Sequence, residues 1–270
     1  MHSLHSRIGT HEVAVEIGGM PVLLRTQSAF FRDLLTWRYD GFVNSSASPR
    51  FEFDVELIDP GESDDADVEV RRDRDCWSLR RGDFRAQWDP EAGTGRIRQS
   101  ANPYSIDSVL RIVHSLALAE EDGFLLHSAS AIRGGRAFLF SGVSGAGKTT
   151  ISRLAPGDVT LLSDEISYVR RTGQHYVASG TPFTGELAQV GENCSAPIAA
   201  LFLLEKGREN LIEPVAAAEA LRSLLRNILF FTNDPDLVKL VFRAALDFIE
   251  RVPVWRLTFL PDERVWNLIV

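Results

Sequence analysis

The run from Gly142 to Thr149 has the residue types and the spacing that hold the phosphates of a nucleotide. It reads Gly-Val-Ser-Gly-Ala-Gly-Lys-Thr and matches the pattern G-x-x-x-x-G-K-[S/T] at every fixed position. Glycines let successive backbone N–H groups turn inward around a diphosphate. In this pattern Lys148 reaches the β- and γ-phosphates, and the Thr149 hydroxyl ligates Mg²⁺.

The context of this run argues against a chance match. A buried apolar strand is expected over 137–140, directly before the run, and a helix-competent segment follows over 149–154. Such a helix would present its positive N-terminal end to the phosphates. We therefore predict that the chain binds ATP with Mg²⁺. The residues expected to contact the nucleotide are Gly142, Ser144, Gly145, Ala146, Gly147, Lys148, Thr149 and Thr150.

Two acidic residues, Asp164 and Glu165, follow the next apolar segment, 159–163. In a P-loop fold, an acid at the end of a parallel strand beside the loop holds Mg²⁺ or activates an attacking hydroxyl. An exposed turn after a strand is the alternative for such a pair. The sixteen-residue step from Lys148 fits one short helix, a turn and one strand, which favours the functional interpretation.

Other polar residues carry weaker signals. His127 lies between the apolar runs 124–126 and 129–132, where a lone histidine is more often a core residue than a catalyst. Arg222 and Arg226 are four residues apart on one helical face. They would clamp an acceptor phosphate or carboxylate, although solvated helix charges are the more common explanation.

Composition restricts the class of protein. The 270 residues carry a formal net charge of −8 with a sequence pI near 5.3, so there is no global basic field, and neither nucleic acid nor an anionic membrane is an expected partner. The two cysteines, Cys76 and Cys194, lack Cys-x-x-Cys spacing, which fits a reducing compartment. No signal-peptide pattern occurs near the start, and no apolar run reaches about 18 residues. We expect a cytoplasmic protein.

The chain divides at Asn102-Pro103, where a turn signal precedes a helical pattern over 106–118. We expect a strand-rich α+β region over 1–101 and an α/β domain over 102–270. Strands are predicted in the first region at 13–17, 22–24, 51–57, 68–70, 77–79 and 84–88, with a helix at 29–37 and a solvated acidic loop at 59–67. In the second region we predict strands at 124–132, 137–140, 159–162, 198–204 and 254–259, helices at 216–229 and 237–249, and a strand or helical turn at 265–270.

Four segments occur in an order that is similar to a known family: Leu126 to Ser130, Arg133 to Arg136, Ser144 to Thr149, and Leu162 to Glu165. Together they resemble the HPr kinase/phosphorylase family of bacterial serine kinases, whose P-loop fold is akin to that of phosphoenolpyruvate carboxykinase. The resemblance covers roughly 124–169, with a weaker similarity that continues to Val270. It implies an α/β P-loop kinase domain with a smaller N-terminal strand-rich α+β region.

The resemblance also implies roles for individual residues. Asp164 would be the catalytic base, and His127, on the strand before the loop, would position Asp164 or the acceptor. Thr149 would ligate Mg²⁺ together with the acidic pair. Glu165 stands where the family has an aspartate.

Two departures bear on the substrate. The family's later Glu-Ile-Arg-Gly signature, which is linked to the phosphorylase reaction, has no counterpart, and residues 1–101 do not match the family's own N-terminal domain. The segments 180–186, 196–198 and 203–205 look more like divergent HPr-kinase-related proteins. Recognition of HPr and the reverse reaction are therefore not implied. The segment 180–186 is either a lid over the nucleotide or a surface turn.

The leading hypothesis is a kinase that transfers the γ-phosphoryl group of ATP to a hydroxyl, either of a serine in a protein or peptide or of a small metabolite. The alternative is a nucleotide-dependent binding or maturation partner with little or no phosphotransfer, whose strand-rich half docks a peptide. A carboxykinase-like enzyme is a third interpretation, and it requires further ligands that the sequence does not reveal. The sequence leaves open the acceptor and whether the chain forms a homo-oligomer.

Overall fold

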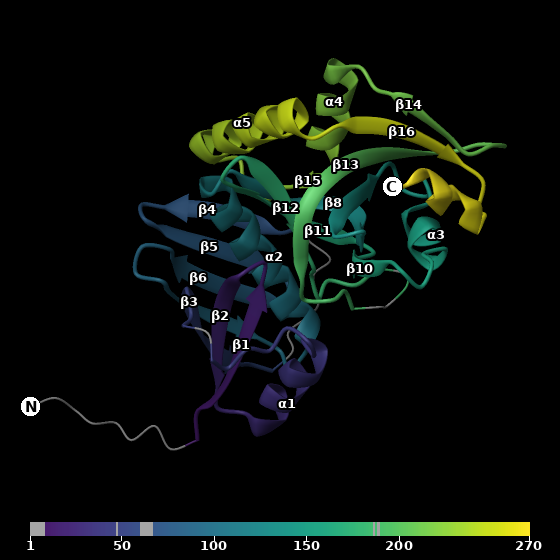
Figure 1. The fold of residues 1–270 in the computed structure, drawn as a ribbon. Coiled ribbons are helices and arrows are strands. Elements are labelled where there is room, and N and C mark those ends of the chain that lie inside the picture. Colours follow the sequence, from purple (N-terminus) through teal and green to yellow (C-terminus); the bar gives the residue numbers. More distant parts are fainter. Residues whose placement is uncertain (1–8, 47, 60–66, 186, 188–189) are drawn as a thin grey trace, which may run out of the picture. The chain divides into compact units, whose positions relative to one another are not determined.

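The protein is a mixed α/β structure with two sheets (Figure 1). The computed structural model describes residues 9–46, 48–59, 67–185, 187 and 190–270. The chain separates into two compact units, residues 1–110 and 111–270. Helix α2 (Pro103–Glu120) contains this division, and the expected boundary at 101/102 lies just before the helix begins. The expected acidic loop at 59–67 falls mostly outside the described residues.

The first unit is built on a seven-stranded sheet in the order β1-β2-β3-β7-β6-β5-β4. Its pairs are antiparallel except β2–β3 and β3–β7, which are parallel. Along β3, Phe51, Phe53 and Val55 are buried while Asp54 and Glu56 are exposed, so one face forms a core and the other faces water. The strands are β1 (His11–Ile17), β2 (Met20–Thr26), β3 (Phe51–Leu57), β4 (Glu69–Asp73), β5 (Cys76–Arg81), β6 (Phe84–Asp89) and β7 (Thr94–Gln99).

Helix α1 (Ala29–Arg38) of this unit begins where the sequence predicts a helix. Ser28 is its N-cap, and the Ser28 hydroxyl accepts a hydrogen bond from the Phe31 N–H at 3.2 Å. Phe31 and Leu35, one turn apart, are buried against the unit. Among the described residues, no helix of either unit combines the length and the apolar content needed to cross a bilayer.

The second unit contains the nine-stranded sheet. Seven of its strands follow the order β10-β8-β11-β12-β13-β16-β14; in addition, β9 pairs with both β8 and β13, and β15 pairs with β8. Strands β8, β9, β13, β12 and β11 pair in a closed circuit, because each pairs with the next and β11 returns to β8. The strands are β8 (Gly123–Arg133), β9 (Arg136–Ser141), β10 (Thr160–Ser163), β11 (Ile166–Thr172), β12 (His175–Ser179), β13 (Ser195–Lys206), β14 (Leu211–Pro214), β15 (Ile228–Leu229) and β16 (Val254–Phe259).

Helices cover both faces of β9, which explains why its sequence reads as a continuous apolar run. Leu139 packs with residues of α4 (Ala217–Asn227) and α5 (Pro235–Arg251). Phe138 and Phe140 pack on the other side with α3 (Lys148–Arg153) and the C-terminal 3-10 helix η1 (Glu263–Leu268). Figure 1 shows α4 and α5 together, and α3 near the yellow C-terminal segment. This packing holds α3, whose first two residues, Lys148 and Thr149, are the end of the 142–149 loop.

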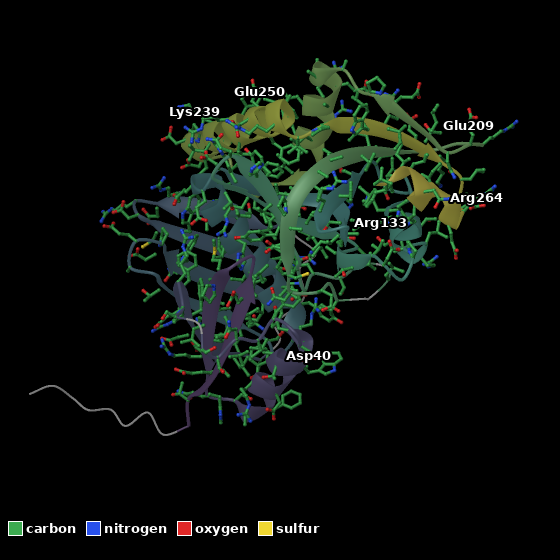
Figure 2. All side chains as sticks on the ribbon, viewed as in Figure 1. Asp40, Arg133, Glu209, Lys239, Glu250 and Arg264 are labelled. Atoms are coloured by element: carbon green, nitrogen blue, oxygen red, sulfur yellow. The ribbon has the colours of Figure 1, made fainter. Side chains whose placement is uncertain are left out.

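The C-terminal segment is anchored by specific hydrogen bonds. The Trp266 indole N–H donates to the Ile151 carbonyl of α3 at 3.1 Å, and the Trp266 ring packs edge-on against Phe140. Arg133, labelled in Figure 2, donates to the Ile269 carbonyl at 3.0 Å and also to the Trp266 carbonyl. Residues 263–268 therefore form the helical turn that was one of the two predictions for the end of the chain.

Candidate functional site

Strand β8 brings two of the predicted site segments to one edge of the sheet. Strands β9 and β10 both run antiparallel to β8, on its two sides, so their C-terminal ends point the same way. Ser141, at the end of β9, pairs with Ser128, and Ser163, at the end of β10, pairs with Ser130. The 142–149 loop and the acidic pair therefore begin two residues apart along β8.

Asp164 was predicted to lie at the end of a parallel strand beside the loop. Strand β10 does run parallel to β9, but the two are not neighbours, because β8 lies between them. The two outer strands run in the same direction, so the acid still reaches the edge where the loop begins. Two hydrogen bonds hold this edge together: the Ser128 N–H donates to the Glu165 carbonyl at 3.1 Å, and the Ser141 side-chain hydroxyl donates to the His127 carbonyl at 3.0 Å.

The 142–149 loop has a backbone that requires its glycines. Gly147 is the N-cap of α3 with φ of 117°, and Gly145 has φ of 76°. A Cβ added to Gly142 would lie 2.8 Å from the Cβ of Ala146, so the loop closes on itself there. Ala146 N–H donates to the Val143 carbonyl at 3.0 Å. Helix α3 (Lys148–Arg153) has six residues, the same length as the predicted helical segment 149–154, and it begins one residue earlier.

Lys148 is a buried cation at the base of this loop. Its residue is 8% exposed, and the ammonium donates to the Gly142 carbonyl at 3.2 Å. Thr149 and Thr150 are half-buried, and in the described part of the chain their hydroxyls form no hydrogen bond. Ser144 is exposed at the tip of the loop. An ammonium and hydroxyls of this kind, with a turn of backbone N–H groups, are the donors that phosphate oxygens accept from.

Asp164 is nearly buried, at 4% exposure, and both of its carboxylate oxygens accept backbone hydrogen bonds. Gly185 N–H donates to one oxygen at 2.9 Å, and Leu187 N–H donates to the other at 3.0 Å. A Cβ on Gly185 would lie 2.4 Å from the Glu165 Oε2. The described part of the expected lid-or-turn segment 180–186 thus packs against the acidic pair, and Glu186 lies outside the described residues.

His127 is half-buried and faces the acidic pair. Its Nδ1 lies 3.6 Å from the Glu165 Oε1. Burial, and then the positive charges of Lys148 and Arg111, lower the pKa of His127 below its ordinary 6.5, while Glu165 acts in the opposite direction. The imidazole is therefore neutral at pH 7. The interpretation of His127 as an ordinary core histidine does not fit this position at the site edge.

Arg111 is a site-edge residue that the sequence reasoning missed. It lies on α2, and its charge is close enough to His127 to lower that pKa. Its guanidinium carbon is 4.9 Å from the Phe183 ring centroid. The feature of the sequence that could have indicated this residue is the presence of an arginine within the largely apolar run 109–119. Arg222 and Arg226 are exposed on α4, as expected of solvated helix charges, the explanation favoured for them over an acceptor clamp.

The donor set fits Mg²⁺ held jointly by protein and nucleotide. Among the described residues, no three His, Cys, Asp or Glu side chains converge in a metal-binding group. Mg²⁺ in nucleotide sites is commonly bound by one or two protein oxygens, with phosphates and water completing the shell. The Thr149 hydroxyl and the carboxylates of Asp164 and Glu165 are oxygen donors of the required type.

Comparison with known proteins identifies a family for most of this second unit. A family model described as "SynChlorMet cassette protein ScmC" matches residues 98–269, well over half of the chain. No curated protein sequence matches the chain. Among solved structures, the HPr(Ser) kinase/phosphatase from Coxiella burnetii is similar with a TM-score of 0.25 and 14% identity, over 44% of this chain and 88% of that chain.

Proposed function

The chain belongs to the ScmC family, and from that premise we propose that it is an ATP- and Mg²⁺-dependent phosphotransferase acting on a hydroxyl. One observation carries the proposal. The register of β8 brings the loop with its buried Lys148 and the acidic pair that begins at Asp164 to a single edge of the sheet. A phosphate-binding loop beside a carboxylate is the arrangement that phosphoryl transfer to a hydroxyl requires.

In the proposed reaction, the acceptor hydroxyl oxygen forms a bond to the γ-phosphorus of ATP. The bond between that phosphorus and the β,γ-bridging oxygen breaks, and ADP leaves with the electron pair. Asp164 accepts the hydroxyl proton. The loop N–H groups and Lys148 stabilise the negative charge on the phosphoryl oxygens. Mg²⁺, when bound through Thr149 and the acidic pair, neutralises phosphate charge.

His127 acts in this scheme as a positioning residue. Because its imidazole is neutral at pH 7, it can accept a hydrogen bond from the acceptor hydroxyl or from a water beside Asp164. The acceptor is a serine of a protein or peptide, or a small alcohol. Little covalent chemistry is asked of the protein, so positioning and electrostatics supply most of the rate.

The test compares ATP turnover, phosphate transfer and nucleotide affinity in the wild type with those in Lys148→Ala and Asp164→Asn. Matched controls are Lys239→Ala and Asp236→Asn, an exposed ion pair on α5. Lys148→Ala is expected to weaken ATP binding by about 10- to 100-fold, the value of a lost charge-assisted contact to phosphate. Asp164→Asn is expected to bind ATP and to lose transfer. Transfer that persists in Asp164→Asn would refute the assignment of the base.

One observation favours a second candidate, a nucleotide-dependent binding or maturation partner. Both Asp164 oxygens already accept backbone N–H groups, from Gly185 and Leu187, so this carboxylate also organises the neighbouring segment. A wild-type chain that binds ATP but transfers no phosphate to serine peptides or small alcohols would favour this candidate over the kinase.

A further inference from the structure

The outer face of the first unit's sheet carries arginines directly opposite one another. In β5, β6 and β7 the residues alternate, with Leu79, Ala86 and Ile97 buried on the inner face. On the outer face, Arg80 of β5 pairs in register with Arg85 of β6, and Arg85 pairs with Arg98 of β7. Arg96 lies two residues from Arg98 on the same face. We call Arg80, Arg85, Arg96 and Arg98 the arginine ladder.

Within this unit the ladder is only partly neutralised. Arg98 contacts Glu56 at 3.0 Å. In the described part of the chain, Arg80, Arg85 and Arg96 form neither an ion pair nor a hydrogen bond. Like charges directly opposite on neighbouring strands destabilise a sheet. The ladder therefore places four positive charges side by side in a chain whose net charge is −8, with carboxylates in register opposite Arg80, Arg96 and Arg98.

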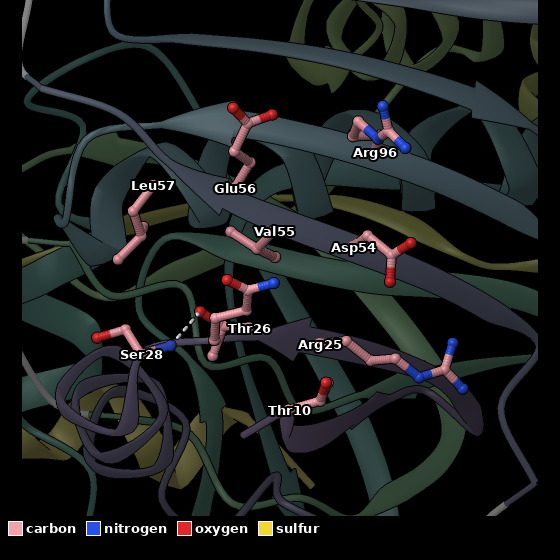
Figure 3. Close-up of a pocket in the computed structure, with 10 residues that line it drawn as sticks. Thr10, Arg25, Thr26, Ser28, Asp54, Val55, Glu56, Leu57 and Arg96 are labelled. Carbon is pink, nitrogen blue, oxygen red and sulfur yellow. Dashed lines mark hydrogen bonds between the residues drawn. The ribbon is translucent and has the colours of Figure 1, made fainter. Parts of the chain in front are cut away.

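A hollow of about 680 Å³ adjoins the ladder on this unit (Figure 3). Arg96 lines it, together with Arg25 on β2 and the carboxylates of Asp54 and Glu56 on β3. Arg25 is already paired, with Glu12 at 2.9 Å and Glu52 at 2.6 Å. Arg96 is thus the ladder member that faces the hollow, and its charge is available to a ligand that enters there.

We propose that the arginine ladder is a docking surface for an acidic polypeptide segment. The carboxylates on this face decide the class of partner. Asp54, Glu56 and Glu69 flank the ladder, and they would repel a nucleic acid, whose charges recur every few ångströms along its backbone. In an extended peptide the charged side chains can be spaced more widely, because alternate side chains on one face are about 6.6 Å apart. Its carboxylates can therefore lie over the arginines and avoid the flanking acids.

This surface lies largely outside the part of the chain that the family match covers. The match begins at residue 98, so Arg80, Arg85 and Arg96 precede it. Docking here does not depend on phosphoryl transfer, and a failure of one proposal leaves the other standing.

The experiment measures binding by fluorescence anisotropy with the full chain. The probes are a dye-labelled peptide of alternating Glu and Ala, its Gln-containing counterpart, and an oligothymidylate of the same length. The test variant is Arg80→Gln with Arg85→Gln. The matched control is Arg136→Gln with Arg208→Gln, two exposed arginines of the second unit that lose the same charge. A charge-retaining variant, Arg80→Lys with Arg85→Lys, completes the set.

The wild type and the control are expected to bind the Glu peptide, with affinity that falls as salt rises to about 0.15 M. The Gln variant should bind about tenfold more weakly, since two charged contacts are lost, and the Lys variant should retain most of the binding. The Gln variant should also unfold at an equal or higher temperature, because charge repulsion is relieved. Equal binding by the Gln variant and the control would overturn the proposal, as would no binding of the Glu peptide or tighter binding of the oligothymidylate.

Discussion

The glycines of the 142–149 loop provide a sharp test of the site geometry. Gly145 and Gly147 both have positive φ, but their surroundings differ. A Cβ on Gly147 would lie 2.7 Å from the Phe259 ring, whereas a Cβ on Gly145 would meet nothing within 4 Å. Replacement of each glycine by alanine therefore adds backbone strain in both cases and a steric clash only at Gly147.

The expected losses follow from these contacts. Positive φ costs an alanine about 1–2 kcal/mol, and the lower entropy of the unfolded chain returns about 0.4–1 kcal/mol. Gly145→Ala should therefore lower the free energy of unfolding by about 1 kcal/mol or less. At Gly147 the φ of 117° lies beyond the left-handed region that alanine reaches. Displacement of the Phe259 ring adds about 1–3 kcal/mol, for a total of about 2–4 kcal/mol.

Thermal unfolding of the full chain, followed by circular dichroism without nucleotide, measures this difference. For a unit of this size each 1 kcal/mol shifts the unfolding temperature by roughly 2–4 °C. Gly147→Ala should lower it by roughly 4–16 °C, and Gly145→Ala by less than about 4 °C. A Gly147→Ala, Phe259→Leu double variant should recover part of the loss. Equal losses at the two glycines, or no recovery, would refute the assignment of the clash.

Three further predictions concern the same unit. The pKa of His127 is lowered in the folded chain, so as the pH falls below 6.5 the unfolded chain binds a proton at this residue before the folded chain does. The free energy of unfolding should therefore fall more steeply with decreasing pH in the wild type than in His127→Gln. Unfolding temperatures measured from pH 7.5 downward test this, and parallel curves for the two proteins would contradict it. Trp266→Phe removes the indole hydrogen bond to the Ile151 carbonyl and leaves a smaller ring in a fully buried site, so urea unfolding should show a loss of about 2 kcal/mol or more, and an unchanged midpoint would count against that bond. A Cβ on Gly191 would lie 1.7 Å from the Leu162 carbonyl oxygen, whereas one on Gly157 would meet nothing within 4 Å. In urea unfolding, Gly191→Ala should lower the free energy of unfolding by about 3 kcal/mol or more, and Gly157→Ala by less than about 0.5 kcal/mol. Similar losses for the two variants would refute the close approach at Gly191.

The elements predicted correctly from the sequence are those with a strong hydrophobic period. Strand β3 alternates apolar and acidic residues, and α1 begins at a serine N-cap. The helix predicted at 216–229 ends instead at Asn227, because Ile228 and Leu229 pair with β8 as β15. Such a two-residue strand depends on a partner about a hundred residues away in sequence, which no local pattern reveals.

Strands β7, β11, β12 and β14 were not predicted. In β7, Gly95 interrupts the pattern, and the structure shows why it is required: a Cβ there would lie 2.4 Å from the Phe53 ring. In β11, three polar residues follow the apolar start. Their strand conformation comes from pairing with β8 and β12 rather than from local propensity.

The candidate site was predictable where a single segment carries its chemistry and less so where distant segments meet. The 142–149 loop and the acidic pair each have a local signature. The close contact of Gly185 with Glu165 and the position of Arg111 beside His127 arise only when α2, β8 and the 180–185 segment come together. Such contacts between residues that are distant in sequence depend on tertiary structure, so no local sequence pattern predicts them.

The junction at residues 127 and 128 of β8 determines how these parts act together. On one side of β8, His127 pairs with Ile166 of β11, and on the other side, Ser128 pairs with Ser141 of β9. The Ser128 hydroxyl also donates to the Ser167 hydroxyl at 2.8 Å, so the two partner strands are linked through one residue. Because the loop follows β9 and the acidic pair lies between β10 and β11, the pairing of these strands with β8 fixes the positions of the loop and the acidic pair relative to each other. The separation of Lys148 and Asp164, on which the proposed phosphoryl transfer would depend, is therefore set by strand pairing.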